Sequence, residues 1–446
     1  MHPLDPEDLP PVEPVRRPPR PARPTARHYR NRRIAVGVGA LAALGLVVAG
    51  IVALAGGDDD GTDVAASGTA SSSTTTGTPD PATSTPGAGS TPSTTDKGGT
   101  DSAPGKDAAR SPEGSGNAVT LAFAGDSNFE GLDGALTSNA AGVLAPVAPL
   151  LSGADVAMVN LETVLGNSAG TPAAKTFTFR TPPQALDALK AAGVDVVTMA
   201  NNHGMDYGPA GLEGSLAIRD ATEFPILGVG RNEAEAYRPY VTEVKGQRIG
   251  IIAASDVFDD NLRAQWTATG AQPGIASAEE AHQERLAAAV RELRPQVDTL
   301  VVYLHYGTEK ETCPNARQKE LVNLLTGAGA DIVVGTHAHR LQGLGYLGDR
   351  FVAYGLGNFA FRAASPAAAQ SGVLEVTATG RRIDGFRWRP ATISGTVPRP
   401  DPNESAGLSV MAERRSCAGL TDAPTSPSST SPSSTSPSST SPGGSR

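Results

Sequence analysis

Residues 331–339 read Asp-Ile-Val-Val-Gly-Thr-His-Ala-His, and this stretch decides how the rest of the chain is interpreted. Its β-branched residues predict a buried strand that Gly335 ends, followed by His337 and His339. In a half-extended loop, side chains at positions i and i+2 point to the same side, so both imidazoles can reach one metal ion or a close pair of ions. Taken alone, the pair fits two surface histidines at a turn better than it fits a metal site.

Two other histidines change that balance. The chain has seven histidines, and His203 and His305 each lie at or just past the end of an apolar run. Folds of the α/β class place their ligands at the carboxyl ends of strands. The sequence therefore favours a shared polar site.

The composition divides the chain into ordered and disordered parts. Residues 56–117 and 421–446 consist almost entirely of Gly, Ser, Thr, Pro, Ala and Asp, so we expect a disordered linker and a disordered repeat tail. They are either plain spacers or carriers of O-linked sugars. Residues 118–420 remain for one large α/β domain. The net charge of −9 argues against a nucleic-acid partner.

The N-terminal region predicts a membrane anchor. Residues 1–33 form a Pro-rich tail with eight arginines, and residues 34–55 run for 22 positions without a charge. A helix of that length crosses a bilayer. Because the arginines flank its N-terminal end, we expect residues 1–33 in the cytoplasm and the domain outside the cell. The alternatives are a cleaved signal peptide, which is usually shorter in its apolar run, and a buried soluble helix.

Within the domain, strands and helices alternate, which predicts a mostly parallel sheet with right-handed crossovers. Residues 372–379 and 383–389 are expected to form an antiparallel edge pair. Residues 256–274 are polar and show no periodicity, so we expect a surface loop. Several predicted strands stop at polar residues, and together these strand ends offer Asp126, Glu162, Asn202, His203, His305, His337 and His339.

Carboxylate, amide and imidazole groups in one pocket suit one or two divalent ions of the Mn, Fe or Zn type. In a two-ion site an acidic residue bridges the ions, and either Glu162 or Asp126 fits that role. Asn202 would be a ligand, and His203 would lie beside the ions and protonate a leaving group. Each residue also has a simpler interpretation: Asp126 as a helix N-cap, Glu162 as a surface residue and Asn202 as a turn former.

The motifs at these positions, taken in order, resemble the CapA (poly-gamma-glutamate capsule biosynthesis) family. They are Gly125-Asp126, Asn160-Leu161-Glu162, Ala200-Asn201-Asn202-His203 with Asp206-Tyr207-Gly208, His305-Tyr306-Gly307-Thr308-Glu309, Gly335-Thr336-His337-Ala338-His339 and Leu356-Gly357-Asn358-Phe359. That family is similar to the calcineurin-like metallophosphoesterases. The resemblance implies an α/β fold of four layers, an α/β/β/α sandwich, with a dimetal site at the strand ends.

The resemblance also implies roles for individual residues. The metal ligands would be Asp126, Glu162, Asn202, His305, His337 and His339. His203 and Asp126 would be catalytic. One departure stands out, because those phosphoesterases open with Asp-x-His whereas Asp126 is followed here by Ser127 and Asn128. A single ion, or a loosely held second one, is therefore also compatible with the sequence.

Substrate contacts are less well defined by the sequence. Arg180 is expected to reach an anionic group in the cleft, although it fits a surface ion pair equally well. We assign Asn201, Glu309 and Asn358, which lie in the same motifs, to substrate binding as well. Cys313 and Cys417 form an even pair in a domain expected outside the membrane, which predicts a disulfide between them; two free thiols are the alternative.

Two functions remain open at this point. The first is a metal-dependent hydrolase at the cell surface, acting on a phosphoester or on an amide of an envelope polymer. The second is a non-catalytic protein that retains or exports an anionic envelope polymer such as poly-gamma-glutamate. Membership of an envelope-biosynthesis complex is compatible with both.

Overall fold

The computed structural model describes residues 114–425. Residues 1–113 and 426–446 lie outside the described part, and with them the predicted cytoplasmic tail, the predicted transmembrane helix and most of the two predicted disordered segments. Between residues 114 and 425, no helix combines the length and the apolar character that a membrane span requires.

One large sheet contains the first strand of the described part. Its order is β17(Val397–Pro400), β16(Arg382–Ser394), β15(Gln370–Thr379), β1(Val119–Ser127), β2(Val156–Leu161), β5(Val196–Thr198) and β6(Ile226–Leu227). The strands β1, β2, β5 and β6 run parallel, whereas β15 pairs antiparallel with β1. The predicted antiparallel pairing of residues 372–379 with 383–389 is confirmed as β15 with β16. Its placement at the edge of the sheet is wrong, because β17 lies beyond β16 and β15 lies next to β1.

A second large sheet contains most of the stretch 331–339, as its strand β12(Ile332–His337). Its order is β13(Leu344–Leu347), β14(Arg350–Ala353), β12, β11(Thr299–Tyr306), β9(Gln247–Ser255) and β8(Tyr240–Val244). The four inner strands are parallel, and β8 and β13 are antiparallel at the edges. Parallel inner strands connected through helices confirm the predicted α/β class.

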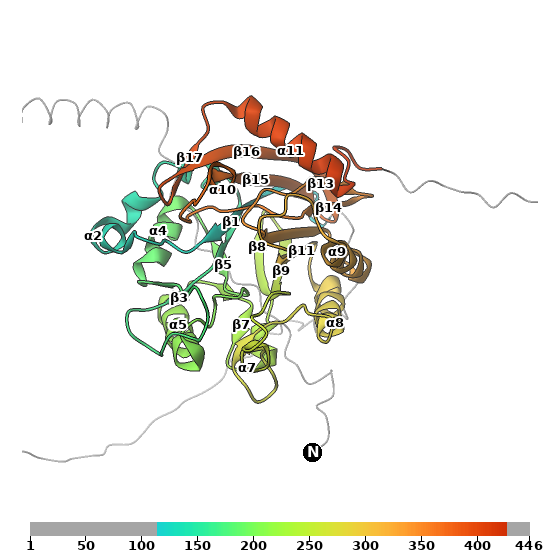
Figure 1. The fold of residues 1–446 in the computed structure, drawn as a ribbon. Coiled ribbons are helices and arrows are strands. Elements are labelled where there is room, and N and C mark those ends of the chain that lie inside the picture. Colours follow the sequence, from blue (N-terminus) through green and yellow to red (C-terminus); the bar gives the residue numbers. More distant parts are fainter. Residues whose placement is uncertain (1–113, 426–446) are drawn as a thin grey trace, which may run out of the picture. The chain divides into compact units, whose positions relative to one another are not determined.

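Helices and short strands complete the described part (Figure 1). The helices are α2(Asp133–Val143), α3(Ala148–Leu151), α4(Gln184–Ala192), α5(Gly208–Thr222), α6(Glu233–Ala236), α7(Arg263–Trp266), α8(Gln283–Leu293), α9(Ala316–Ala328), α10(Pro366–Ala369) and α11(Glu404–Ala418), with a 3-10 turn, η2(Arg294–Gln296). Two short pairs, β3(Val164–Leu165) with β4(Arg180–Thr181) and β7(Val229–Gly230) with β10(Gly274–Ile275), lie outside the large sheets.

The side chains of β11 alternate between two hydrophobic cores. Val301 and Tyr303 belong to the core shared with β1, β2 and β15, whereas Leu300 and Val302 belong to a core that includes residues of α8 and α9. The Tyr303 hydroxyl donates a hydrogen bond of 2.7 Å to the carbonyl of Ala124 on β1. The second sheet is therefore covered by the first sheet on one face and by helices on the other.

The segment 256–274 is more ordered than the predicted surface loop. It contains α7 and the first residue of β10, and Phe258, Leu262 and Trp266 are buried. These three apolar residues hold the segment against the domain. They are few among polar neighbours, so the composition did not indicate them. We call residues 256–274 the insertion.

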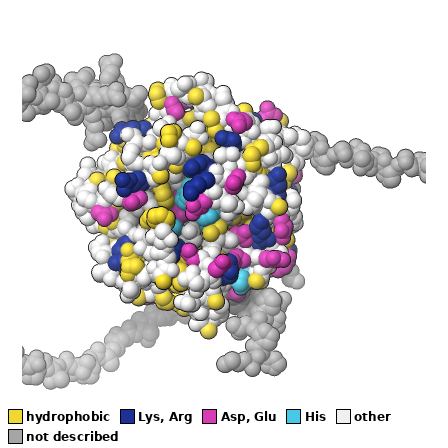
Figure 2. All heavy atoms as spheres, in the orientation of Figure 1, with side chains coloured by type: hydrophobic (Ala, Val, Ile, Leu, Met, Phe, Trp, Pro, Cys, Tyr) yellow, Lys and Arg dark blue, Asp and Glu magenta, His cyan; other side chains and the backbone are white. Residues whose placement is uncertain are grey.

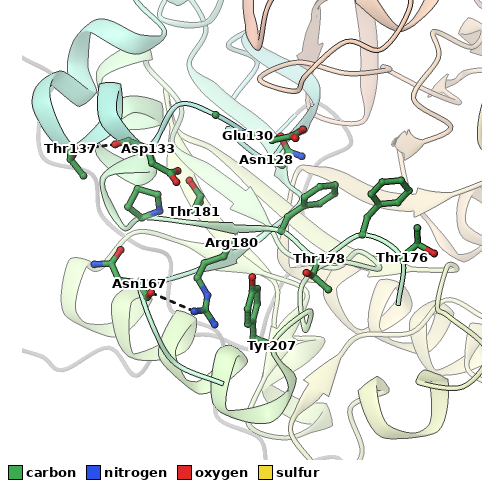
Figure 3. A pocket seen from close by; sticks show the side chains of 15 residues that line it. Asn128, Glu130, Asp133, Thr137, Asn167, Thr176, Thr178, Arg180, Thr181 and Tyr207 are labelled. Atoms are coloured by element: carbon green, nitrogen blue, oxygen red, sulfur yellow. Dashed lines mark hydrogen bonds between the residues drawn. The ribbon is translucent and has the colours of Figure 1, made fainter. Parts of the chain in front are cut away.

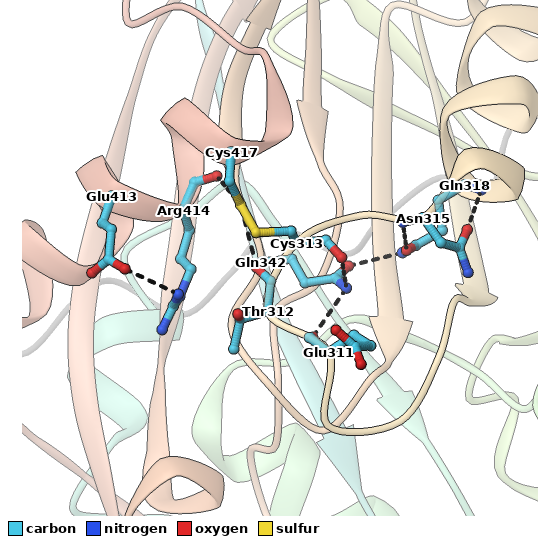
Figure 4. Close-up of a disulfide and its surroundings, with 9 residues drawn as sticks. All are labelled: Glu311, Thr312, Cys313, Asn315, Gln318, Gln342, Glu413, Arg414 and Cys417. Carbon is cyan, nitrogen blue, oxygen red and sulfur yellow. Dashed lines mark hydrogen bonds and ion pairs between the residues drawn. A yellow bond between two sulfur atoms is a disulfide. The ribbon is translucent and has the colours of Figure 1, made fainter.

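Cys313 and Cys417 are joined by a disulfide, which links the loop after β11 to the last turn of α11 (Figure 4). The Gln342 side chain donates to the carbonyls of Glu311 and Cys313 in this loop. In the same loop, the Lys310 amide donates to the carbonyl of Ala338, which lies between the two histidines of the opening stretch. The disulfide therefore fixes α11 to the loop after β11, and that loop contacts the histidine segment through Lys310 and Ala338.

A buried aspartate holds the start of β12. Asp331 has no exposed surface, and its carboxylate forms ion pairs with Arg294, Arg350 and Arg381. It also accepts a hydrogen bond of 2.9 Å from the Leu300 amide on β11. A buried carboxylate that loses its charge leaves its cationic partners without compensation.

We expect Asp331→Asn to lower the free energy of unfolding by about 3 kcal/mol, because breaking a buried ion pair costs about 3–5 kcal/mol. Urea denaturation of the full chain measures the change. Asp349→Asn is the matched control, since Asp349 pairs with the same Arg350 but its side chain is 70% exposed. The control should lose no more than about 1 kcal/mol. Equal losses in the two variants would contradict the role given to Asp331.

We expect the double substitution Cys313→Ser and Cys417→Ser to lower the free energy of unfolding by about 2–4 kcal/mol, because the disulfide closes a long loop in the unfolded chain. The two cysteines are 104 positions apart. Reductant should lower the stability of the natural chain to that of the double variant and should leave the variant unchanged. A natural chain whose unfolding midpoint ignores reductant would argue against this contribution.

Candidate metal centre

Asp126 lies at the carboxyl end of β1 and is fully buried. One carboxylate oxygen accepts a hydrogen bond of 2.8 Å from the Asn160 amide, and the other accepts one of 3.2 Å from the backbone N–H of His337. The second oxygen also lies 3.3 Å from Nδ1 of His339. Asp126 therefore joins the end of the first sheet to the histidine loop of the second.

Glu162 directly follows β2 and is also fully buried. Neither of its carboxylate oxygens has a hydrogen-bond partner. Three imidazole nitrogens surround Oε1: Nε2 of His305 at 3.6 Å, Nε2 of His339 at 3.8 Å and Nε2 of His203 at 3.9 Å. An unpaired buried carboxylate is costly unless a positive charge joins it.

His305 is the last residue but one of β11 and lies in the middle of this group. Its Nε2 lies 2.8 Å from Oδ1 of Asn202 and 3.1 Å from Nδ1 of His337. Its Nδ1 lies 3.1 Å from the Thr336 hydroxyl on the neighbouring strand. The predicted ligands Asp126, Glu162, Asn202, His305, His337 and His339 thus lie together, and Figure 2 shows histidine side chains gathered with acidic and basic ones near the centre of one face.

The backbone at the two loop histidines is strained. His337 has a φ of 92° and His339 a φ of 50°, and residues with a Cβ rarely adopt such values. Positions of this kind cost on the order of 1–3 kcal/mol and concentrate at functional sites. The strand does not end at Gly335 as predicted, because β12 continues to His337. The glycine is required there by packing, since a Cβ would meet the Tyr306 ring at 2.1 Å.

His203 lies beside the group and is oriented by a carboxylate. Its Nδ1 is 2.6 Å from Oδ2 of Asp206, and its ring packs on Phe179 with the ring centres 4.3 Å apart. Because Nδ1 is engaged with Asp206, Nε2 is the nitrogen that faces Glu162. A neutral ring held in this way presents an unprotonated Nε2, which suits a proton acceptor.

Asparagine side chains connect the elements around the centre. The Asn201 amide donates to Oδ1 of Asn160, and its oxygen accepts from the backbone N–H of His203. Asn358 places its oxygen 2.7 Å from Nδ1 of His339 and donates to the carbonyl of Ala368. Both ends of each of these amides have a partner inside the protein. Substrate binding by Asn201 and Asn358 stays a prediction, and their contacts indicate a positioning role.

Burial and neighbouring charge shift the titration of these groups. Burial raises the pKa of Glu162 well above its usual value, and the charge of Asp126 raises it further. Burial lowers the pKa of His337 to about 3 and lowers the pKa of His305 well below its usual value. Burial also lowers the pKa of His203, despite the opposing effect of Asp206. Neutral imidazoles are the form that ligates metals.

His339 shows the opposite shift. Burial acts to lower its pKa, but the charge of Glu162 and the hydrogen bond to Asp126 outweigh it and raise the pKa of His339 to about 10. In the metal-free protein a proton on this ring therefore supplies positive charge to the two carboxylates.

The donor set fits a divalent metal ion. Two overlapping groups have ligand atoms within 4.8 Å of one another: Glu162 with His337 and His339, and Asp126 and Glu162 with His305. Glu162 belongs to both groups and has both oxygens free of hydrogen bonds. Nitrogen and oxygen donors without a thiolate suit Mn, Fe or Zn. Of the two residues that the sequence offered as a bridge, Glu162 has the better placement.

A groove of about 670 Å³ has Asn128 and Tyr207 among its lining residues (Figure 3). None of the six predicted ligands lines it, but Phe179, which packs on the His203 ring, does. Arg180 lines it, with its guanidinium 3.5 Å from the centre of the Tyr207 ring. The guanidinium also donates to the carbonyls of Asn167 and Ala169. Glu309, in contrast, is exposed on the loop after β11, and none of its described contacts reaches the centre. Substrate contacts by Arg180 and Glu309 stay predictions.

Four residues that shape the site had no predicted role. Asn160 and Asp206 stand inside the quoted motifs, and the spacing of Asp206 three positions after His203 was a usable signal. Phe361, whose ring centre is 4.8 Å from that of His339, and Lys175, a buried cation, gave no signal because their partners are distant in sequence.

Comparison with known proteins identifies relatives of this chain. Residues 120–363 match the family described as bacterial capsule synthesis protein PGA_cap. The match includes every predicted metal ligand and ends before β15.

Curated relatives carry related names. The chain is 27% identical to the PGA biosynthesis protein CapA of Bacillus subtilis over 261 residues, covering 58% of this chain and 67% of that protein. It is 31% identical to the capsule biosynthesis protein CapA of Bacillus anthracis over 179 residues, covering 40% of this chain and 43% of that protein. It is 24% identical to a probable polyglutamine synthesis accessory protein of Mycobacterium tuberculosis, covering 46% and 55%.

We expect the full chain to bind Mn²⁺, and we expect Glu162→Gln to weaken that binding by about 100-fold or more, because outer residues alone change metal affinity about 10–100-fold. Isothermal titration calorimetry on protein stripped of metal gives the affinity. Glu309→Gln is the matched control, since that glutamate is exposed and should leave the affinity unchanged. Equal affinities for the natural chain and Glu162→Gln would remove Glu162 from the metal site.

Proposed function

Because this chain belongs to the bacterial capsule synthesis protein PGA_cap family, which is metallophosphoesterase-like, we propose that it is a metal-dependent hydrolase of cell-envelope polymer biosynthesis. The observation that carries the proposal is the buried Glu162 carboxylate, which has no hydrogen-bond partner and faces three imidazoles. The proposed fold type is the four-layer α/β/β/α sandwich of the metallophosphoesterases. Two sheets that share a core, with helices α8 and α9 on the far face of one, support it.

In this proposal six residues hold one or two divalent ions of the Mn, Fe or Zn type: Asp126, Glu162, Asn202, His305, His337 and His339. When bound, such ions supply Lewis acidity toward oxygen atoms of a substrate. Asp126, which the sequence also predicted as catalytic, holds the His337 backbone in place through its second oxygen. One proposed ligand, Asp126, therefore holds the backbone of another, His337, in position.

His203 is the proposed proton-transfer residue. Asp206 holds its Nδ1, so proton exchange with substrate or water takes place at Nε2. Since burial lowers the pKa of His203, the neutral ring is favoured. It would take a proton from water at Nε2 and deliver that proton to the leaving group. Phe179 packs on the ring and limits access of water on that side.

The substrate class that we propose is an anionic envelope polymer or a phosphoester. Two of the relatives are named for capsule or PGA biosynthesis, and the groove that Phe179 lines offers room for a segment of chain. Arg180 is the cation that lines this groove. Its guanidinium already serves two backbone carbonyls, so an anion would have to share it.

We further propose that the chain is a single-pass membrane protein, with residues 1–33 in the cytoplasm, residues 34–55 in the membrane and the domain outside. The uncharged run behind eight arginines supports this topology. The Cys313–Cys417 disulfide supports an oxidising location for the domain. Partners in an envelope-biosynthesis complex belong to the same proposal.

One observation favours the alternative of a non-catalytic, metal-containing protein that binds, retains or exports an anionic polymer. Asn128 stands where the resembling phosphoesterases carry a histidine, and its amide nitrogen is buried without a partner. A missing imidazole weakens one metal position. In this alternative, a single ion binds carboxylates of the polymer and no substrate is turned over.

We expect the Mn²⁺-loaded full chain to hydrolyse bis(p-nitrophenyl) phosphate or a γ-glutamyl amide, and we expect His337→Ala to lower kcat/KM by about 100-fold or more, since removing a group that stabilises the transition state costs about 10²–10³. Release of p-nitrophenolate or of free amine measures the rate. Stripping the metal should abolish the activity, and returning Mn²⁺ should restore it.

Glu284→Gln serves as the control and should retain full activity, because Glu284 lies on α8 with its side chain 71% exposed and has no proposed role. A chain that binds Mn²⁺ but cleaves neither ester nor amide would reject the hydrolase and support the polymer-binding role. A chain that binds no metal would reject both.

A further inference from the structure

Lys175 is a buried cation next to the metal centre, in the segment before β4. Its side chain is 5% exposed. Three oxygen atoms surround its ammonium group: the Asn202 carbonyl at 2.5 Å, Oδ2 of Asp259 at 2.8 Å and Oδ1 of Asp206 at 3.1 Å. The Trp266 ring lies on a further side, with its centre 5.1 Å away. The ammonium group is therefore enclosed by protein.

The first of these contacts fixes a proposed ligand. Asn202 uses its backbone carbonyl to accept from Lys175 and its side-chain oxygen to approach Nε2 of His305 at 2.8 Å. Asn202 lies in the turn after β5, outside the regular hydrogen bonding of the sheet. A hydrogen bond to a charged donor at this carbonyl restricts the direction in which the amide points.

The second contact reaches His203 through Asp206. The Asp206 side chain is fully buried, with one oxygen facing Lys175 and the other accepting from His203 and from the Phe179 amide. Lys175 and His203 therefore contact the two different oxygens of one buried carboxylate, at 3.1 Å and 2.6 Å. Lys175 thus supports the group that orients the His203 ring.

The third contact comes from the insertion. Asp259 pairs with Lys175, and Asn261 donates to the carbonyl of Ala174 at 3.5 Å. Trp266, from α7, is buried against the Lys175 ammonium. The insertion and the metal centre therefore meet at one side chain.

We propose that Lys175 is a positioning residue that holds Asn202 and the Asp206–His203 pair in place and fixes the insertion against them. The catalytic part of this inference rests on the proposed function, whereas the positioning part concerns the metal-free chain as well. Lys175 does not act on substrate, because its ammonium is enclosed by the three oxygens and the indole. It acts through the residues that it contacts.

The experiment compares four full-length chains: the natural one, Lys175→Met, Asp259→Asn and Lys319→Met. Lys319 is an exposed lysine on α9, so its substitution controls for loss of a positive charge. Hydrogen exchange followed by mass spectrometry on the metal-free chains reports residues 199–208 and 256–274 separately. Calorimetric titration with Mn²⁺ reports affinity.

Lys175→Met should speed exchange in both segments and weaken Mn²⁺ binding about 10–100-fold, which is the usual effect of losing a residue that orients ligands. Asp259→Asn should speed exchange in residues 256–274 alone, and Lys319→Met should match the natural chain. If Lys175→Met fails to fold, Lys175→Arg takes its place. It keeps the charge but lacks the compact ammonium, and it should speed exchange in residues 199–208.

Unchanged exchange in residues 199–208 in the substituted chain would overturn the proposal, whatever the enzyme's activity. Faster exchange there in Lys175→Met, together with a natural chain that binds no Mn²⁺, would reject the proposed function and leave the positioning role standing. A Lys319→Met chain that behaves like Lys175→Met would also overturn the proposal, because the effect would then be one of net charge.

Discussion

The unpaired carboxylate of Glu162 is the constraint on which the described part of the chain depends. A buried negative charge without a hydrogen bond is tolerated when positive charge surrounds it. In the metal-free chain that charge is a proton on His339, whose pKa is raised to about 10. The same carboxylate is the feature that most favours a cation at the proposed metal centre.

The two sheets have to pack before the centre exists. Asp126 and Glu162 come from the carboxyl ends of β1 and β2, whereas His305 and His337 come from the ends of β11 and β12. The hydrogen bond from the His337 amide to Asp126 spans the two sheets at the site, and the Tyr303 hydroxyl spans them in the core. Strained backbone at His337 and His339 is sustained by this packing. Fold and site are therefore assembled together.

Sequence reasoning reached the α/β class and the strand-end residues because local patterns encode both. Apolar runs that stop at Asp126 or His305 reveal a buried strand and its polar end without any knowledge of the partner strands. It misplaced β15, since nothing local in residues 370–379 names β1 as the neighbour. It missed Lys175 for the same reason, because a lysine in a polar segment has no signature of burial until Trp266 and Asp259 are placed beside it. The buried apolar residues of the insertion were hidden by its polar composition.

The position of β15 has a consequence for how the chain reaches its final form. β1 opens the described part, yet one of its two neighbours is a strand near the far end, with Val119 opposite Ala378. Until β15 has paired with β1, the backbone amides and carbonyls along that edge of β1 have no strand partner. They can then pair with a strand of another chain. Such long-range pairing is slow, and it leaves the nascent domain open to aggregation. A chain shortened before residue 370 would retain all its proposed ligands and still lack the strand that closes its first sheet.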